Sequence, residues 1–310
     1  MTLVNPLQLL NRAQKAHSAL GAFNANTLEQ IQAIVIAAEA ENAAAYVQVS
    51  HRALTYLGSG NEMLGLEYVA AAGRVAAQSV SVPIALHLDH ATEEEARRAI
   101  ALGFTSVMFD GSLLPFAENV AMTKSLSKEA HTAGVCIEAE LGEVPKPDVN
   151  DAAAVLTDPA EAASFVAATG IDALAVALGS VHGSTEKSVS IDLQRLQAIR
   201  AQVTVPLVLH GSSGVNDSDI AEGIRLGLCK INVATQLNVS FSRSVRVVLG
   251  RDATIVDPRR YLGPARDAMI EAVRERIRFF STVAIEAPGN TDDEGLHRTV
   301  RPAPQSRETD

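Results

Sequence analysis

Tryptophan is absent from this chain of 310 residues, and cysteine occurs only twice, at Cys136 and Cys229. Both cysteines stand in apolar runs, so we expect buried free thiols rather than a disulfide. No pair has the CxxC spacing of a thiolate zinc site, which excludes that kind of metal centre. No apolar run reaches the ~18–20 residues that cross a bilayer, and the first residues lack the basic-then-apolar layout of a signal peptide. We therefore expect a soluble, cytoplasmic protein.

Positive charge is also scarce, because 26 Lys and Arg residues stand against 36 Asp and Glu, a formal net charge of −10. Such a surface repels nucleic acid and anionic lipid, so we expect neither as a partner. Hydrophobic residues make up 47% of the chain, enough to bury a large core. The length exceeds the ~250 residues typical of a (β/α)8 barrel. One barrel with an extension or two smaller domains would both fit.

Short apolar runs rich in β-branched residues recur along the chain without strict alternation. That pattern is typical of strands buried on both faces of a parallel sheet. The eight predicted strands are Gly21–Asn24, Ala45–Ser50, Pro83–Asp89, Thr105–Asp110, Val135–Leu141, Ala173–Gly179, Pro206–Gly211 and Lys230–Thr235.

Helical segments separate these strands. They are predicted at Thr27–Glu41, Leu64–Ser79, Thr92–Ala101, Pro115–Ala133, Pro159–Thr169, Asp192–Ala201 and Asp217–Leu226. Eight alternating βα units in one domain favour an α/β fold with a closed (β/α)8 TIM barrel, and a doubly wound open sheet is the alternative.

A helical extension is predicted after the last strand, at residues 236–249 and from Pro264 to about Phe280. Residues 1–285 are therefore expected to form a single domain. The segment from Glu286 to Asp310 is polar and has almost no apolar residues. We predict that this segment, 286–310, is a disordered tail.

Three histidines stand where predicted strands end: His90 after 83–89, His182 after 173–179 and His210 at the end of 206–211. The carboxyl ends of TIM-barrel strands carry the active site, so these side chains can converge above the barrel. Three imidazoles with one open position are a catalytic zinc arrangement. We therefore predict Zn²⁺ on His90, His182 and His210. No such placement applies to His17, His51, His131 and His297.

Carboxylates stand at the same strand ends. Asp89 precedes His90, and we expect it either to orient a histidine or to act as a general acid/base on a substrate hydroxyl. Asp110 in FDGS and Glu140 in EAELGE also end predicted strands. They could bind a second, peripheral cation or accept hydrogen bonds from amides at the rim.

Small residues gather at the ends of the last three predicted strands. They let backbone N–H groups approach an anion closely, and phosphate sites recur at this place in barrels. The predicted phosphate-binding residues are Gly183, Gly211, Ser212, Ser213, Gly214, Asn232, Val233, Ala234 and Thr235. A metal, an acid/base and a phosphate site together indicate chemistry on a phosphorylated ketose, where zinc would polarise the carbonyl and stabilise an ene-diolate.

Several segments, in order over residues 1–282, resemble the class II fructose- and tagatose-bisphosphate aldolases. They are GAFNANTLE (21–29), YVQVS (46–50), ALHLDH (85–90), GFTSVMFDGSLLPFAEN (103–119), GVCIEAELGE (134–143), LTDPAEAASFVAATGIDALAVALGSVHG (156–183), VPLVLHGSSGV (205–215), INVATQL (231–237) and DPRRYL (257–262). The segment NVATQL is closer to the tagatose type.

The resemblance implies a zinc-dependent TIM-barrel lyase. Its reaction is the reversible cleavage of a ketose 1,6-bisphosphate, or a related ketose 1-phosphate, to dihydroxyacetone phosphate and an aldehyde. It implies zinc on the three histidines and Asp89 as proton donor to the hydroxyl of the aldehyde half. Dihydroxyacetone phosphate would lie at the predicted phosphate-binding residues, while Asn24 and Ser50 match residues that face the aldehyde half.

The resemblance also implies further ions and subunits. Asp110 and Glu140 match ligands of a secondary cation site, and a monovalent cation (Na⁺ or K⁺) near the phosphate loops is usual in the family. Arg259 matches an arginine that crosses a subunit interface to the distal phosphate of the substrate. A homodimer or homotetramer is therefore implied.

Two segments depart from the family pattern. After ELGE the family usually has Gly-Gly and then the glutamate that deprotonates dihydroxyacetone phosphate, whereas residues 144–149 read VPKPDV. The two prolines stiffen this loop, and Asp148 is the predicted substitute for the glutamate, with a side chain one methylene shorter. The loop after His182 reads GSTEK, where Gly-x-Tyr is common.

Two other functions are open to such a barrel. A non-catalytic subunit of a larger assembly would lack ligands or proton donors, but all three histidines and Asp89 are present, and only the altered 144–149 loop favours it. A zinc hydrolase normally carries His-x-His on its first strand, which here reads FNAN at 23–26.

Overall fold

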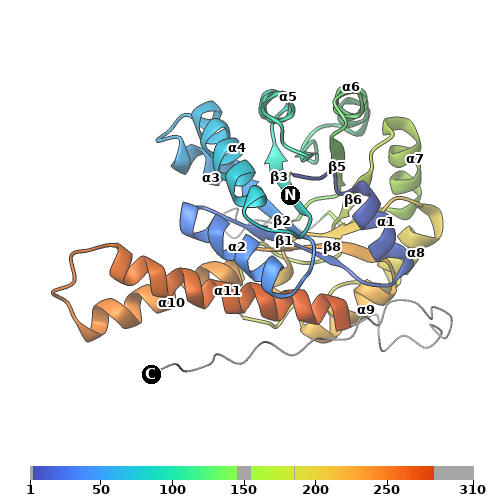
Figure 1. Cartoon of the computed structure of the whole chain (residues 1–310). Coiled ribbons are helices and arrows are strands. Elements are labelled where there is room, and N and C mark those ends of the chain that lie inside the picture. Colours follow the sequence, from blue (N-terminus) through green and yellow to red (C-terminus); the bar gives the residue numbers. More distant parts are fainter. Residues whose placement is uncertain (1–2, 145–154, 185, 283–310) are drawn as a thin grey trace.

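The computed structural model describes residues 3–144, 155–184 and 186–282. Eight parallel strands form a closed barrel in chain order, with β8 paired back to β1 (Figure 1). This closure confirms the TIM-barrel prediction and excludes the open sheet. The strands are β1 (Leu20–Asn24), β2 (Ala45–Ser50), β3 (Ile84–Ala91), β4 (Ser106–Phe109), β5 (Cys136–Leu141), β6 (Ala173–Val176), β7 (Leu207–Leu209) and β8 (Leu228–Val233).

The predicted helices cover the outside of the barrel (Figure 1). They are α2 (Leu28–Ala40), α4 (Glu62–Gln78), α5 (Glu93–Leu102), α6 (Phe116–Thr132), α7 (Pro159–Thr169), α8 (Leu193–Gln202) and α9 (Asp217–Arg225). Local signals fix their ends. Thr92 and Glu95 form a reciprocal capping box at the start of α5, and Gly103 ends that helix with a φ of 87°.

Two short helices are present that the sequence pattern did not indicate. Helix α1 (Leu7–Lys15) buries Leu10 and Ala13 against the N-terminal ends of the strands. Helix α3 (His51–Leu57) follows β2 directly, and the Ser50 hydroxyl caps it by accepting from the Ala53 N–H at 3.4 Å. One turn of 3-10 helix, Ser212–Gly214, follows β7.

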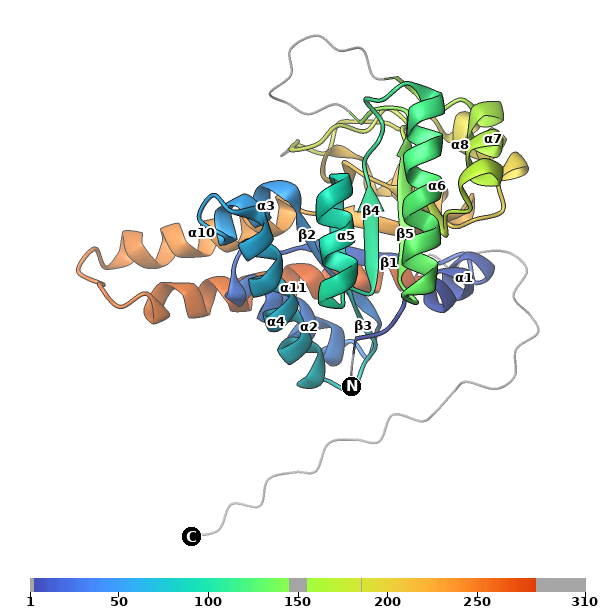
Figure 2. The ribbon, with the colours of Figure 1, turned by 90° about the horizontal axis from the view of Figure 1, so that it is seen from above.

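The C-terminal extension forms an arm that projects from the barrel. Helices α10 (Thr235–Arg251) and α11 (Arg259–Thr282) lie side by side along it (Figures 1 and 2). Helix α11 begins before Pro264, earlier than predicted. The Asp257 carboxylate accepts from the Arg259 N–H at 3.0 Å and so starts the helix upstream of the proline. The predicted tail, 286–310, lies outside the described residues.

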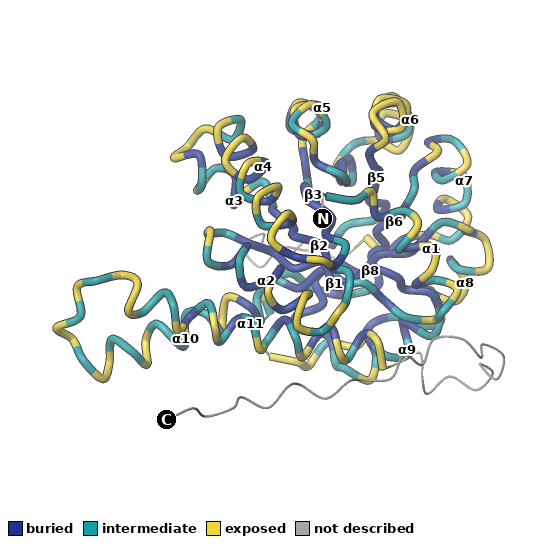
Figure 3. Tube along the Cα trace, in the orientation of Figure 1, coloured by how far each residue is buried: buried dark blue, intermediate teal, exposed yellow. Residues whose placement is uncertain are grey.

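The core is continuous from the strands to the inner faces of the helices, and the outward faces of the helices are exposed (Figure 3). The free thiols of Cys136 and Cys229 are buried, as predicted. Strands β6 to β8 end earlier than their sequence patterns suggested. The residues after β6 and β7 turn away through Gly179 (φ 94°) and Gly211 (φ 64°), and Thr235 already belongs to α10.

Within the described residues, no helix combines the length and the apolar character that a membrane span requires.

We expect Leu126→Ala in α6 to lower the free energy of unfolding by about 2–5 kcal/mol. The side chain is fully buried, so its truncation leaves a cavity. Urea denaturation measures the loss. The matched control is Leu113→Ala, whose side chain is 80% exposed and whose effect should stay within about 0.5 kcal/mol. Equal effects at both positions would contradict the assigned core.

Candidate active site

A pocket of about 430 Å³ opens at the carboxyl ends of the strands. Thirteen of the predicted site residues line it: Asn24, Ser50, Asp89, His90, Asp110, His182, Gly183, Gly211, Ser212, Ser213, Asn232, Ala234 and Thr235. The strand ends therefore bring together residues that are up to 211 positions apart in the sequence, since Asn24 and Thr235 face the same space.

A bulge at the end of β3 turns two consecutive side chains toward this pocket. The pairing of β3 with β4 shifts register between Leu88 and Ala91, and His90 adopts a left-handed φ of 51°. In a regular strand, neighbouring side chains point to opposite faces. The bulge therefore lets Asp89 and His90 both line the pocket.

The three predicted histidines converge. Each of His90, His182 and His210 offers one ring nitrogen, and these nitrogens lie within 4.8 Å of one another. The ring centroids of His90 and His210 are 4.9 Å apart, and those of His90 and His182 are 5.3 Å apart. Nε2 of His90 and Nδ1 of His210 are buried and make no hydrogen bond in the described part of the chain.

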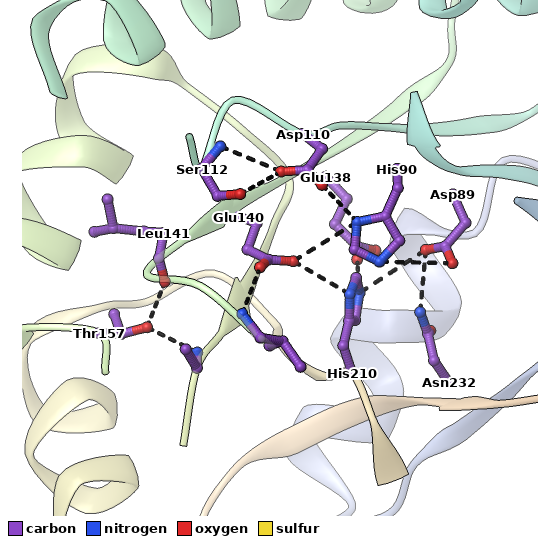
Figure 4. A network of polar contacts seen from close by, with 12 residues as sticks. Asp89, His90, Asp110, Ser112, Glu138, Glu140, Leu141, Thr157, His210 and Asn232 are labelled. Atoms are coloured by element: carbon purple, nitrogen blue, oxygen red, sulfur yellow. Dashed lines mark hydrogen bonds and ion pairs between the residues drawn. The ribbon is translucent and has the colours of Figure 1, made fainter. Parts of the chain in front are cut away.

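Carboxylates determine which nitrogen His90 and His210 present. Asp110 Oδ2 lies 2.7 Å from His90 Nδ1, and Glu138 Oε1 lies 2.9 Å from His210 Nε2 (Figure 4). An ionised carboxylate can only accept, so those two nitrogens donate. Nε2 of His90 and Nδ1 of His210 are then the nitrogens left to bind a proton or a metal ion. This donor set fits a metal ion, because metal-binding histidines commonly donate their other N–H to a carboxylate.

Glu138 forms a buried ion pair with Lys230. Lys230, fully buried in β8, donates from Nζ to Glu138 Oε2 at 2.9 Å and to His87 Nε2 at 3.3 Å. His87 Nδ1 donates to the Ser106 hydroxyl at 2.8 Å. Burial and the nearby Lys230 lower the pKa of His87 to about 3, so this imidazole is neutral. Every polar atom of Lys230 and Glu138 thus faces a partner inside the barrel.

Negative charge surrounds the histidines. Glu140 Oε2 lies 3.3 Å from His210 Nδ1 and 4.0 Å from His90 Nδ1 (Figure 4). Burial opposes a positive charge on His210, but the hydrogen bond to Glu138, with Glu140 and Asp89 nearby, raises its pKa to about 10. Carboxylates that favour a proton on this ring also favour a metal cation in its place.

Asp89 is held at the edge of the same cluster. Its Oδ1 accepts from Asn232 Nδ2 at 3.1 Å, and its Oδ2 lies 4.0 Å from His90 Nε2 (Figure 4). Burial alone would raise the pKa of Asp89, but His90, His210 and Lys230 lower it below the usual value. Asp89 is therefore ionised and next to the nitrogen that could hold a metal.

The small residues after β6 and β7 approach each other closely. Gly211 has a φ of 64°, and a Cβ there would come 3.0 Å from the backbone carbonyl carbon of Val181. Only glycine fits both conditions. Gly183, Ser212 and Ser213 line the pocket beside it, so this wall of the pocket is built from backbone and hydroxyl groups.

Four predicted residues are not part of the pocket lining, and one cannot be assessed. Gly214 is buried at the end of the 3-10 turn and lies against Ser184. Val233 is buried in β8 and packs in the core. Glu140 lies beneath the lining, against His210. The Arg259 side chain is 89% exposed on the arm and is paired with Asp257 at 2.8 Å. Asp148 lies outside the described residues.

The sequence pattern did not predict a role for Glu138, Lys230 and His87, although their positions within buried strands were a signal. Side chains two positions apart in a strand share a face. Glu138 therefore shares a face with Glu140, and Lys230 shares one with Asn232. A charged residue within an otherwise apolar buried run is the pattern that could have revealed the pair.

We expect Lys230→Met to lower the free energy of unfolding of the metal-free protein by about 3–5 kcal/mol, because Glu138 is then left buried without its counter-charge. Urea denaturation measures this. The double variant Lys230→Met/Glu138→Leu should recover part of the loss, and Lys124→Met on the exposed face of α6 serves as the neutral control. A loss below about 1 kcal/mol for Lys230→Met would show that the pair is not buried as described.

Comparison with known proteins identifies the family. Residues 4–284 match the family model described as fructose-bisphosphate aldolase class-II. A fructose-bisphosphate aldolase of Geobacillus stearothermophilus is 40% identical over 285 residues, covering 91% of this chain and 98% of the relative. The YdjI aldolase of Escherichia coli K12 has a TM-score of 0.76 at 31% identity, covering 90% and 97% of the two chains. A putative fructose-1,6-bisphosphate aldolase of Coccidioides immitis has a TM-score of 0.77 at 33% identity, covering 90% and 96%. The chain therefore belongs to the class-II fructose-bisphosphate aldolase family of lyases.

Proposed function

We propose that this enzyme uses zinc to cleave a ketose 1,6-bisphosphate of the fructose or tagatose type, or a related ketose 1-phosphate. The products are dihydroxyacetone phosphate and an aldehyde, and the reaction is reversible. The observation that carries the proposal is the cluster of His90, His182 and His210, with ring nitrogens within 4.8 Å of one another inside the pocket.

Zinc is a metal that suits these donors. Imidazole nitrogens bind zinc well, and three histidines that leave a position open for a substrate are a catalytic zinc arrangement. When bound, such an ion acts as a Lewis acid that polarises the ketose carbonyl and favours the ene-diolate formed by cleavage beside it. Asp110 and Glu138 would orient two of the three ligands through the hydrogen bonds described above.

Asp89 is the residue that we assign to proton transfer at the aldehyde half. Its carboxylate lies in the pocket and accepts a hydrogen bond from the side chain of Asn232. In the cleavage direction it would accept the proton of the hydroxyl on the carbon that becomes the aldehyde, and in the reverse direction it would return that proton. For deprotonation of dihydroxyacetone phosphate, Asp148 remains our candidate from the sequence.

The substrate phosphate is proposed to lie against the loops after β6, β7 and β8. Gly183, Gly211, Ser212 and Ser213 offer backbone N–H and hydroxyl groups along one wall of the pocket, and α10 begins at Thr235 beside them. Backbone N–H groups and the start of a helix are favourable contacts for a phosphate. Asn24, whose Oδ1 accepts from Gln48 Nε2 at 2.9 Å, and Ser50 would face the aldehyde half.

The family resemblance suggests additional ions and a second subunit. Asp110 and Glu140 are candidates for a secondary divalent cation, and a monovalent cation would accompany the phosphate. Arg259 is the first residue of α11, one of the two helices of the projecting arm (Figure 2), and it does not line the pocket of its own chain. Its proposed role, a contact to the distal phosphate bound by another subunit, therefore requires a dimer or tetramer.

We expect exhaustive chelation of divalent metal to abolish cleavage and added zinc to restore it, because the reaction requires a Lewis acid beside the carbonyl. His182→Ala should lower kcat/KM by more than about 100-fold, beyond the 10–100-fold typical of a change behind the ligands. An assay coupled to dihydroxyacetone phosphate detection measures both, with fructose and tagatose 1,6-bisphosphates as substrates.

The control for this experiment is borohydride treatment in the presence of substrate. It should trap no covalent adduct, since the proposed reaction forms no Schiff base with a lysine. Activity that survives the complete removal of divalent metal would disprove the proposal.

A further inference from the structure

Asn26 and Asn238 line the pocket, and neither has a role in the proposed reaction. Asn26 follows β1, and Asn238 lies in the first turn of α10, the helix after β8. Because β8 pairs with β1 to close the barrel, these segments from opposite ends of the sequence meet (Figure 1). Asn26 Nδ2 donates to Asn238 Oδ1 at 3.0 Å.

A buried glutamine joins the two asparagines. Gln30, in the first turn of α2, is 3% exposed. Its Oε1 accepts from the backbone N–H of Asn26 at 2.6 Å, and its Nε2 donates to Asn238 Oδ1 at 3.1 Å. Asn238 Oδ1 therefore accepts two hydrogen bonds, one from each of the other two side chains.

The orientation of these amides follows from one backbone group. A backbone N–H can only donate, so the Gln30 atom that faces the N–H of Asn26 is the oxygen, and Nε2 faces Asn238. Since Nε2 can only donate as well, Asn238 turns its oxygen toward Gln30. Asn238 Nδ2 is the group that remains, and it has no acceptor within the described residues.

This amide donor lies beside the start of α10. Thr235 and Asn238 both line the pocket, as residues three positions apart on one helix face do. The first turn of α10 contains no acidic residue, and its N-cap, Ala234, has no side chain that can accept from the first N–H groups. Those groups are therefore open to an anion, and the amide of Asn238 adds a further donor on the same face.

An exposed asparagine without such partners can present either end of its amide to the pocket. The oxygen would repel a phosphate, whereas the nitrogen would donate to it. Gln30 excludes the first orientation, because turning the amide over would set Asn238 Nδ2 against the donors of Gln30 and Asn26. The amide is thus ordered before a ligand binds, which favours affinity.

Resting on the proposed function, we infer that Asn238 donates a hydrogen bond to the substrate phosphate beside the start of α10, and that Gln30 positions it. Gln30 is buried and does not line the pocket, so it acts through Asn238 rather than on the substrate. Asn26 completes the set by donating to the same oxygen of Asn238.

Calorimetry on the full-length zinc-loaded enzyme measures the binding of dihydroxyacetone phosphate in the absence of an aldehyde. The variants are Asn238→Ala, Gln30→Met and the double variant. Asn5→Ala is the matched control, since Asn5 also makes two hydrogen bonds, with the Leu7 N–H and the Gly134 carbonyl, but does not line the pocket. Zinc content and thermal unfolding are measured for each protein. The inhibition of fructose and tagatose 1,6-bisphosphate cleavage by uncharged dihydroxyacetone tests whether the phosphate is the group that Asn238 contacts.

We expect Asn238→Ala to raise the dissociation constant of dihydroxyacetone phosphate by about 10–100-fold, the effect of one hydrogen bond to a charged group. Gln30→Met should raise it by about 2–10-fold, because the amide is then free to turn. The double variant should match Asn238→Ala, since Gln30 acts through that residue. KM for the bisphosphates should rise with little change in kcat, because the contact persists in the transition state. Zinc content, inhibition by dihydroxyacetone and the binding constant of Asn5→Ala should stay at wild-type values.

Three results would overturn the inference, and they differ from failure of the proposed function. If Asn238→Ala binds dihydroxyacetone phosphate as tightly as the wild type, or weakens dihydroxyacetone equally, Asn238 does not contact the phosphate. If the two single effects add in the double variant, Gln30 does not act through Asn238. If Asn5→Ala weakens binding as much, the effect is a general loss of stability. If the wild-type enzyme with zinc neither binds dihydroxyacetone phosphate nor cleaves either bisphosphate, the proposed function itself fails and the inference with it.

Discussion

The buried carboxylate of Glu138 connects the barrel core to the candidate metal site. One of its oxygens binds Lys230 and the other binds His210. Two opposite charges buried together cost much less than either charge alone, so neither residue can be exchanged without affecting the other. Because the carboxylate is held by Lys230, the His210 ring is restricted to one orientation and presents Nδ1 toward His90 and His182. The geometry of the pocket therefore depends on an ion pair that does not itself line the pocket.

The closed barrel converts positions along the chain into positions around a ring. His90 comes from β3, and His182 and His210 come from the segments after β6 and β7. The closure of the barrel brings one ring nitrogen of each histidine within 4.8 Å of the others. Around them the ring offers different surroundings: backbone and hydroxyl groups beyond β6 to β8, and His51 with Arg52 beyond β2. This division explains how one pocket can receive a substrate whose two ends carry different chemical groups.

Much of the fold was predictable from the sequence, because strands buried on both faces form short runs rich in apolar and β-branched residues, which are easily recognised. Capping by Thr92 and Glu95 and the glycine after α5 are equally local signals. Helices α1 and α3 were missed for a different reason. They are short, and what holds α1 is its contact with the far end of the barrel, where Leu10 and Ala13 are buried. Strands β6 to β8 were predicted too long, since their last residues turn into loops whose conformation depends on neighbouring segments.

Some features of the candidate site were likewise visible in the sequence, and others appeared only in the tertiary structure. The sequence by itself determined the chemistry, three histidines and several carboxylates at strand ends, because residue type and strand-end position are both visible in a linear chain. Tertiary structure alone decided which nitrogen His90 and His210 present, how the bulge at His90 lets Asp89 line the pocket beside it, and that Glu138 and Lys230 meet inside the barrel. It also placed Arg52 in the pocket and Arg259 outside it. The physical reason is that hydrogen-bond direction and burial arise only when distant segments pack together.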